Sequence, residues 1–304
     1  MSMRILVVLG LTLLAAPATG QGTGLSFLRI GVNAHAGSMG DAQVSNVRNA
    51  FATYWNPAGL AGGSNSAAGS HRLWIGDVRV YDVAAQLPIG PNSAWGLALT
   101  ATDSGDLEAR TQPGEPDGLF GAQFISAGVS YARVLSGLRV GMTAKYLRER
   151  IFDTSASGYA VDFGVQADVL GGRLNLGAGL RNLGRMSPLE TKRTPLPRLI
   201  QGGIALSPLQ IITAFDEARL LDLMISIEAS HLFDDRLTRL HLGCGVTIME
   251  LVDLRGGYIS NDELRSYTFG IGLFFDSIDA DYAYIPFEDG FDGPGHILSL
   301  SYYW

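Results

Sequence analysis

Residues 159–169 read YAVDFGVQADV and alternate strictly between two kinds of side chain. One parity is apolar throughout, while the other carries Asp162, Gln166 and Asp168 with small residues between them. Successive side chains of a strand point to opposite faces, so the stretch predicts a strand with one apolar and one polar face. The same alternation returns in residues 173–181, 239–248 and 266–275.

Two architectures produce this alternation: a soluble antiparallel sandwich and an outer-membrane barrel whose apolar face meets lipid. Only 17% of the 304 residues are charged, and the polar parity mixes charges with many of the chain's 39 glycines. A solvated sheet face would instead carry Lys, Glu and Thr. The composition therefore favours the second architecture, an all-β transmembrane antiparallel β-barrel.

The strand count is expected to be about fourteen, with twelve or sixteen as alternatives, because single-chain bacterial barrels have an even number of strands. Short turns should join the strands at one end and longer loops at the other. Residues 207–221 are long for the short side and are expected to hold a helix over 210–220. The predicted strands are 66–76, 78–89, 93–103, 122–134, 138–149, 158–170, 173–182, 198–206, 222–232, 238–248, 251–260, 266–275, 278–285 and 295–304.

Three segments are expected along the chain. Residues 1–20 have one charge, Arg4, then an apolar run and small residues, which is the pattern of a cleaved secretory signal peptide. Residues 21–65 do not alternate and form an N-terminal segment, and residues 66–304 form the barrel. The net charge of −7 without a basic stripe argues against a nucleic-acid partner. The expected location is the outer membrane of a Gram-negative-type bacterium, with its lipid as a partner.

The N-terminal segment is large enough to sit inside the barrel as a plug. Glycines gather on the inward parity, where a glycine often marks the close approach of another backbone. They also fit a second explanation, relief of strain where a barrel bends. The inward glycines are Gly128, Gly141, Gly164, Gly177, Gly179, Gly243, Gly245, Gly270 and Gly272.

The carboxyl terminus alternates apolar and polar residues and ends on an aromatic side chain. A final strand of this kind is similar to the signal that the bacterial barrel-assembly machinery recognises, so this machinery is an expected partner during biogenesis. The residues expected to form the signal are Leu298, Leu300, Tyr302 and Trp304.

The sequence predicts no catalytic residues, no metal site and no cofactor. His241 and Cys244 are three apart on one strand and so face opposite sides. Charges on the inward parity are expected either to neutralise one another, since unpaired buried charges are costly, or to line a permeation path. These lumenal residues are Arg139, Lys145, Asp162, Asp168, Arg173, Arg181, Glu228, Asp279 and Asp281.

Several motifs taken in order resemble the PorV/PorQ family. They include the run from Ala34 to Ala42, in which Gly37, Met39, Gly40 and Asp41 stand out, and the carboxyl-terminal run from Asp281 to Phe287. This family is related to FadL-type fatty-acid channels, which resemble fourteen-stranded barrels with an N-terminal hatch carrying Asn-Pro-Ala. The resemblance assigns the hatch motif to Trp55, Asn56, Pro57, Ala58 and Gly59.

Two functions follow from the resemblance. The first is a non-enzymatic secretion-accessory or protein-binding barrel, similar to type IX secretion components and engaging secreted proteins. The alternative is a FadL-like channel for uptake of hydrophobic small molecules. Asn33, His35 and the absence of very long loops depart from the family pattern. The polar, acidic stretches 103–117 and 288–292 favour protein contact over capture of an apolar ligand.

Overall fold

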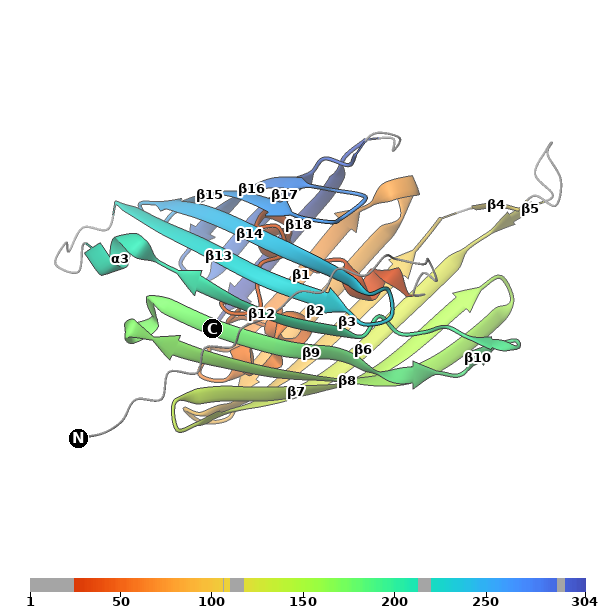
Figure 1. Ribbon diagram of the computed structural model, residues 1–304, viewed down its shortest axis with the longest axis horizontal. Helices are drawn as coiled ribbons and strands as arrows, with labels where there is room; N and C mark the ends of the chain where they lie inside the picture. The colour runs from red at the N-terminus through yellow and green to blue at the C-terminus, as the bar shows by residue number, and fades with distance from the viewer. Residues whose placement is uncertain (1–24, 106, 110–117, 213–219, 289–292) are drawn as a thin grey trace.

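Fourteen antiparallel strands close into a single barrel in the computed structural model, which describes residues 25–105, 107–109, 118–212, 220–288 and 293–304 (Figure 1). Each strand pairs with its neighbours along the chain, and the first pairs with the last to close the ring. The barrel strands are β1 (Ser66–Leu73), β2 (Arg79–Pro88), β3 (Ser93–Asp103), β6 (Ala122–Leu135), β7 (Leu138–Ile151), β8 (Thr154–Val169), β9 (Leu174–Met186), β12 (Leu199–Leu206), β13 (Leu221–Leu232), β14 (Leu237–Ile248), β15 (Val252–Ile259), β16 (Tyr267–Phe275), β17 (Ile278–Ile285) and β18 (Gly295–Tyr303). The predicted fold class and the count of fourteen are confirmed.

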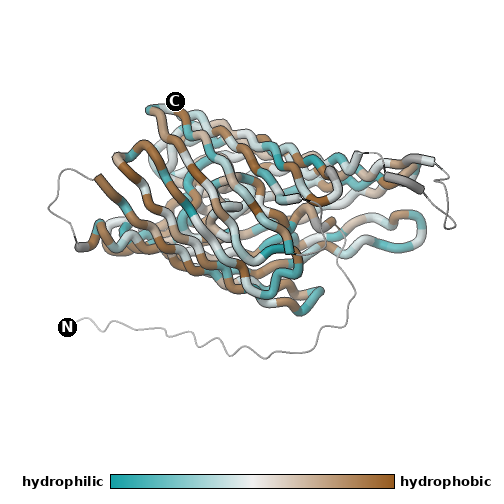
Figure 2. The backbone as a smooth tube through the Cα atoms, turned by 90° about the horizontal axis from the view of Figure 1, so that it is seen from above, coloured by the Kyte–Doolittle hydropathy of each residue, from teal (hydrophilic) through white to brown (hydrophobic). Residues whose placement is uncertain are grey.

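The alternation of the sequence becomes the two faces of the barrel wall. Apolar residues of one parity are exposed on the outside, as in Val83 and Leu97, whereas the residues between them are buried in the interior. Figure 2 shows hydrophobic and paler or hydrophilic positions alternating along the strands. An outward apolar face is what a lipid-spanning barrel requires. Among the described residues, no helix has the length and apolar character needed to cross a bilayer.

The two ends of the barrel differ. One end, called here the loop end, carries the long connections, with two small hairpins: β4 (Leu107–Ala109) with β5 (Gly118–Phe120), and β10 (Pro188–Leu189) with β11 (Lys192–Arg193) (Figure 1). The other, the turn end, has tight turns such as the one at Ser136 and Gly137. Both of these residues have positive φ, as a two-residue hairpin turn requires.

A helix is present where one was expected on the turn end, and the start of it lies within the described residues. Helix α3 (Pro208–Ile212) begins two residues before the predicted start, and residues 213–219 lie outside the described part of the chain. The signal peptide predicted over 1–20 also lies outside the described residues. The remaining helices are short: η1 (Ser26–Arg29), α1 (Ala34–Ser38), α2 (Ala52–Trp55), η2 (Pro57–Leu60), η3 (Ile75–Asp77) and η4 (Leu170–Gly172).

Residues 25–65 lie inside the ring of strands and are called here the inner segment. They form hydrogen bonds to strands on all sides of the barrel, for example from Ala34 N to Ser299 Oγ on β18 (2.6 Å) and from Asn56 Nδ2 to Val165 O on β8 (3.1 Å). The inner segment enters near the loop end, where Leu25 packs in a cluster with Ala156 and Met186. It leaves at the turn end, where β1 begins at Ser66.

The neighbours of each inward glycine show whether it makes room for the inner segment. At five positions a Cβ would collide with the inner segment: Gly141, Gly164, Gly177, Gly243 and Gly270. The other four, which are Gly128, Gly179, Gly245 and Gly272, have side chains of barrel strands as their nearest neighbours. The close approach of a second backbone explains Gly141, Gly177 and Gly243, whereas Gly164 and Gly270 make room for side chains of the inner segment.

Candidate functional site

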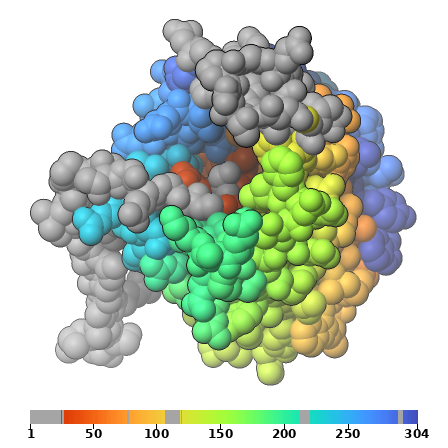
Figure 3. All heavy atoms as spheres, turned by 90° about the vertical axis from the view of Figure 1, so that its right-hand side faces the viewer, coloured from red at the N-terminus to blue at the C-terminus, as the bar shows by residue number. Residues whose placement is uncertain are grey.

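A cavity of about 300 Å³ opens at the loop end, between the start of the inner segment and the inner wall. We call it the vestibule. Its apolar lining is Phe27, Ile30, Trp74, Val78, Val80, Ala122, Phe124 and Leu264. Its polar lining is Arg29, Thr102, Ser104, Arg239, Asp262 and Arg265. Figure 3 looks onto this end, and the inner segment is visible within the ring of strands.

Aromatic rings make the apolar wall of the vestibule. Phe27 of the inner segment stacks on Phe124 of β6 with ring centroids 5.5 Å apart, and Trp74 meets Phe287 edge-on at 4.9 Å. These contacts join the inner segment and two parts of the wall that are far apart in sequence. A mostly apolar, concave site of this volume is typical of a pocket for a small ligand.

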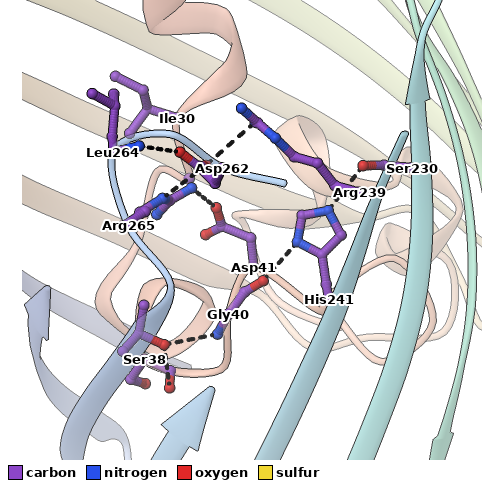
Figure 4. A network of polar contacts seen from close by, with 12 residues as sticks. Ile30, Ser38, Gly40, Asp41, Ser230, Arg239, His241, Asp262, Leu264 and Arg265 are labelled. Carbon is purple, nitrogen blue, oxygen red and sulfur yellow. Dashed lines mark hydrogen bonds and ion pairs between the residues drawn. The ribbon is translucent and has the colours of Figure 1, made fainter. Parts of the chain in front are cut away.

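The polar lining of the vestibule includes a chain of ion pairs (Figure 4), and its Arg265 guanidinium lies 5.5 Å from the centre of the Trp74 ring. Asp262 lies 3.4 Å from both Arg239 Nη1 and Arg265 Nε, and Arg265 also pairs with Asp41 of the inner segment. Burial opposes ionisation of Asp262, but the two guanidinium groups outweigh it and hold the pKa of this carboxyl below its usual range. The buried Nη1 of Arg265 has no hydrogen-bond partner among the described residues.

Below the vestibule, a turn of the inner segment is fixed to the barrel wall by polar side chains. His241 Nδ1 lies 2.7 Å from Gly40 O, and its Nε2 lies 2.8 Å from Ser230 Oγ. Gly40 N donates to Thr268 Oγ1 (3.1 Å), and Val44 N donates to the carboxylate of Glu228 (2.9 Å). Backbone groups that would otherwise be buried without partners are satisfied in this way.

The Trp55–Gly59 motif lies within the interior and holds the inner segment together. Asn56 accepts from Ala58 N (3.2 Å) at the start of η2 and donates to Val44 O (2.7 Å). Trp55 Nε1 donates to Asn33 Oδ1 (2.8 Å), and its carbonyl accepts from Gln201 of β12 (2.9 Å). Every one of the five motif residues is buried: Trp55, Asn56, Pro57, Ala58 and Gly59.

The N-terminal motif residues lie on the β14–β18 side of the interior. Met39 is fully buried, and Gly37 packs against Ile297 of β18. Gly40 and Asp41 both have positive φ, which makes the sharp turn that presents the Asp41 carboxylate to Arg265. Position 40 requires glycine both for this conformation and for space, because a Cβ there would lie 2.9 Å from the carbonyl oxygens of Leu242 and Tyr258.

Three ion pairs account for much of the predicted lumenal set. Lys145 contacts Asp162 at 2.8 Å, and Arg139 Nη1 donates to Asp168 at 2.9 Å. Asp281 pairs with Arg255 at 2.6 Å. These contacts agree with mutual neutralisation, the first of the two roles considered for these charges.

The remaining lumenal residues have other partners. The Arg181 guanidinium carbon lies 4.2 Å from the centre of the Tyr54 ring, and Glu228 accepts from Val44 as described above. Asp279 accepts from the Tyr303 hydroxyl at 2.6 Å. Arg173 directly follows η4 at the turn end, away from the vestibule. The predicted residues thus lie on several levels of the interior and do not form one site.

Sequence reasoning missed several buried charges. Arg72 pairs with Asp82 at 3.1 Å and donates to Gly31 O at 2.5 Å, while Arg255 also pairs with Asp253 at 2.6 Å. The signal was present in β1, where Ser66, Ser70 and Arg72 share one parity. It was weak because the strand also contains alanines and an outward histidine.

The predicted assembly signal lies on the outside of β18. Leu298, Leu300, Tyr302 and Trp304 are all more than half exposed, and the last two rings stack with centroids 5.8 Å apart. Cys244 is exposed and His241 buried, so the strand separates them as expected. Within the described part of the chain, no three His, Cys, Asp or Glu side chains gather as metal ligands would.

Comparison with known proteins gave matches only among solved structures. No family model and no curated protein matches the chain. The *Pseudomonas putida* toluene transporter TodX is 14% identical with a TM-score of 0.64, covering 90% of this chain and 98% of that one. A monoaromatic hydrocarbon channel, CymD, is 11% identical with a TM-score of 0.64, covering 93% and 99%. A *Pseudomonas aeruginosa* FadL homologue is 12% identical with a TM-score of 0.55, covering 89% and 97%.

At these identities the matches establish a shared fold, that of FadL-like outer-membrane barrels. None of the matches described here is a PorV/PorQ protein or a component of type IX secretion. The comparisons therefore bear out the broader part of the expected resemblance, the FadL-like barrel, and give no support to the narrower part.

Proposed function

We propose that the protein is a non-enzymatic outer-membrane channel through which small hydrophobic molecules enter the cell. The vestibule carries this proposal: an aromatic and aliphatic cavity open at the loop end, of the size of a small ligand. The similarity in fold to a toluene transporter and a monoaromatic hydrocarbon channel supports it. The loop end would face outward, as the longer loops of such barrels do.

In this proposal, a hydrophobic molecule leaves water for the apolar wall made by Phe27, Trp74 and Phe124. Burial of apolar surface favours this step by about 25 cal/mol per Å². In the polar lining, Arg239 and Arg265 are already paired with Asp262. Binding of a neutral ligand therefore leaves none of these charges without a partner.

The inner segment would act as a hatch below the vestibule. Among the described residues, a cavity of about 30 Å³ adjoins the vestibule beside Asp41 and Glu228, and another of about 170 Å³ lies at the turn end beside Asp222 and Phe274. The vestibule and the turn-end cavity share no lining residue. Passage therefore requires the inner segment to move. The polar contacts of its turn at Gly40 to Val44 can be exchanged for water during such a movement.

A single substitution in the vestibule tests the proposal. Val80 is buried in its wall and Val83, on the same strand, is half exposed on the outer face. Val80→Phe should fill the cavity and weaken binding of toluene to the purified protein at least tenfold by calorimetry. Val83→Phe is the matched control and should bind normally. Equal binding by both variants, or no binding by the original protein, would overturn the proposal.

The secretion-accessory function predicts a different result. Purification in mild detergent would then recover a secreted protein with the barrel, and cross-linking would place it on the loop end. Recovery of such a partner together with unchanged toluene uptake in cells that lack the barrel would favour this function over the channel.

A further inference from the structure

Four neighbouring strands are longer than a membrane crossing requires. Strands β6, β7, β8 and β9 have 14, 14, 16 and 13 residues, whereas about 9–11 residues span a bilayer. Counted from the turn end, residues 138–146 of β7 and 159–169 of β8 are sufficient for the crossing. The rest of each strand stands beyond the apolar band.

Two tyrosines mark where that band ends. Tyr146 and Tyr159 are directly paired across β7 and β8, and their side chains are 53% and 55% exposed on the outer face. Tyrosine is enriched at the level of lipid headgroups, where its ring meets apolar chains and its hydroxyl meets water. Outward-facing residues level with these two tyrosines, and those nearer the loop end, therefore face the lipid headgroups.

Those positions are occupied by arginines. Arg185 of β9 is directly paired with Tyr159. Arg148 and Arg150 follow Tyr146 along β7 and point outward as it does. All three arginines are exposed. With about 3.4 Å per residue and about 4.8 Å between strands, the Cα atom of Arg148 lies about 7 Å from that of Arg150 and about 12 Å from that of Arg185, and Arg150 and Arg185 are about 17 Å apart. Between them stand the small polar residues Ser155, Ser157 and Ser187, all exposed. The hairpin β10–β11 adds Lys192 and Arg193, also exposed.

None of these five cations forms an ion pair with a described carboxylate. Arg185 donates from Nε to the Tyr159 hydroxyl (2.8 Å), and Arg150 donates from Nε to Phe152 O (3.3 Å). Glu149, which lies between the two β7 arginines, points inward and accepts from Thr194 (2.6 Å). By contrast, the buried Arg72, Arg255 and Arg265 all pair with aspartates.

We propose that Arg148, Arg150 and Arg185, supported by Lys192 and Arg193, bind the phosphate groups of lipid headgroups in the leaflet around the loop end. The guanidinium fork suits phosphate because it donates two parallel hydrogen bonds. The outward direction of the three arginines, at the edge of the apolar band, places them against lipid. The site is independent of the proposed channel function.

The test compares two triple variants with equal change in charge. The site variant is Arg148→Gln, Arg150→Gln and Arg185→Gln. The control variant is Arg79→Gln, Arg133→Gln and Arg236→Gln, three exposed arginines on other parts of the barrel, none with a described ion-pair partner. Both are purified in nonionic detergent and titrated with diphosphorylated lipid A and with its dephosphorylated form, and bound lipid is counted by native mass spectrometry.

We expect the original protein and the control to bind the phosphorylated lipid equally and the dephosphorylated form weakly. The site variant should bind the phosphorylated lipid on the order of a hundredfold more weakly, since each basic residue near a membrane surface contributes about fivefold. Equal binding by all three proteins, or equal binding of both lipids, would overturn the proposal. Full competition by millimolar inorganic phosphate would overturn its lipid part.

A second variant covers a failure of the triple variant to fold. Lys192→Gln with Arg193→Gln changes only the β10–β11 hairpin, which lies outside the fourteen-stranded ring. It should weaken binding of the phosphorylated lipid by an intermediate amount, and no change in its binding would count against the role of the hairpin.

Discussion

Gly141 and Gly245 both face the interior of the barrel but meet different neighbours. A Cβ at Gly141 would collide with the backbone of Pro57, whereas the nearest atom to a Cβ at Gly245 is Asp253 Oδ1 at 3.4 Å. Gly141→Ala should therefore lower the free energy of unfolding by about 1–3 kcal/mol, the usual cost of overpacking. Gly245→Ala should change it little. Urea unfolding in detergent measures both, and equal effects would contradict the close approach of the inner segment.

Asp262 gives the vestibule a predictable dependence on pH. Its folded-state pKa lies below the unfolded value of about 3.9, because Arg265 and Arg239 outweigh the effect of burial. The stability it contributes is therefore fully present above that unfolded value and is lost as pH falls through the folded pKa. The protection of residues 260–266 from hydrogen exchange, relative to the intrinsic rate at each pH, should fall only below about pH 4. Asp262→Asn, the control, should remove this dependence.

Partners of single buried charges could not be predicted from the sequence. Parity places Asp281 on the inward face, but its pairing with Arg255 depends on the alignment of β15, β16 and β17. Arg265 was missed entirely because it lies in a loop, where no alternation exists to give a side chain a direction. The vestibule was missed for a different reason, which is that its lining residues come from segments far apart in the chain.

The inner segment is the element whose removal tests the hatch. A variant without residues 25–65 should still close its ring, because every barrel strand keeps its two neighbours. Its interior would then lack the only described element that fills it, and it should conduct ions in planar bilayers where the original protein does not. Unchanged conductance in a folded variant would contradict the proposed hatch.

Strand positions were predicted well within the membrane and less well beyond it. β3 and β17 match their predicted bounds of 93–103 and 278–285, and β9 runs four residues past its predicted end. Alternation records a difference between lipid on one side and a packed interior on the other. Past the apolar band both faces become polar, so the signal fades although the hydrogen-bonded ladder continues.

A closed ring of strands has no free edge, which should make the whole molecule resistant to detergent. Without boiling, the barrel should stay folded in sodium dodecyl sulfate and migrate differently on a gel from the boiled sample. The hydrogen bonds that close β1 onto β18 are part of this resistance. A Pro substitution at Leu300, in the middle of β18, removes a ladder donor and should abolish the difference in migration. Identical migration of the unheated and boiled original protein would contradict a stable barrel.

The class of fold followed from the alternation because it repeats along nearly the whole barrel. The identity of the transported molecule could not be predicted from the alternation, because the lipid-facing surface of a barrel is similar whatever molecule the barrel admits. The acidic loops were taken to favour a protein partner, whereas the proposed uptake channel rests on the apolar vestibule. Loop composition at the surface carries less information than the aromatic wall that only the folded chain brings together.

The path of the inner segment constrains the order of assembly. It enters near the loop end, runs through the interior and continues directly into β1, the strand that must join β18 to complete the ring. Once the seam between the first and last strands has closed, about forty residues would have to be threaded lengthwise through the lumen. We therefore expect the sheet to curl around the inner segment while that seam is still open. The glycines that make room for it thus act during biogenesis, before any molecule reaches the vestibule.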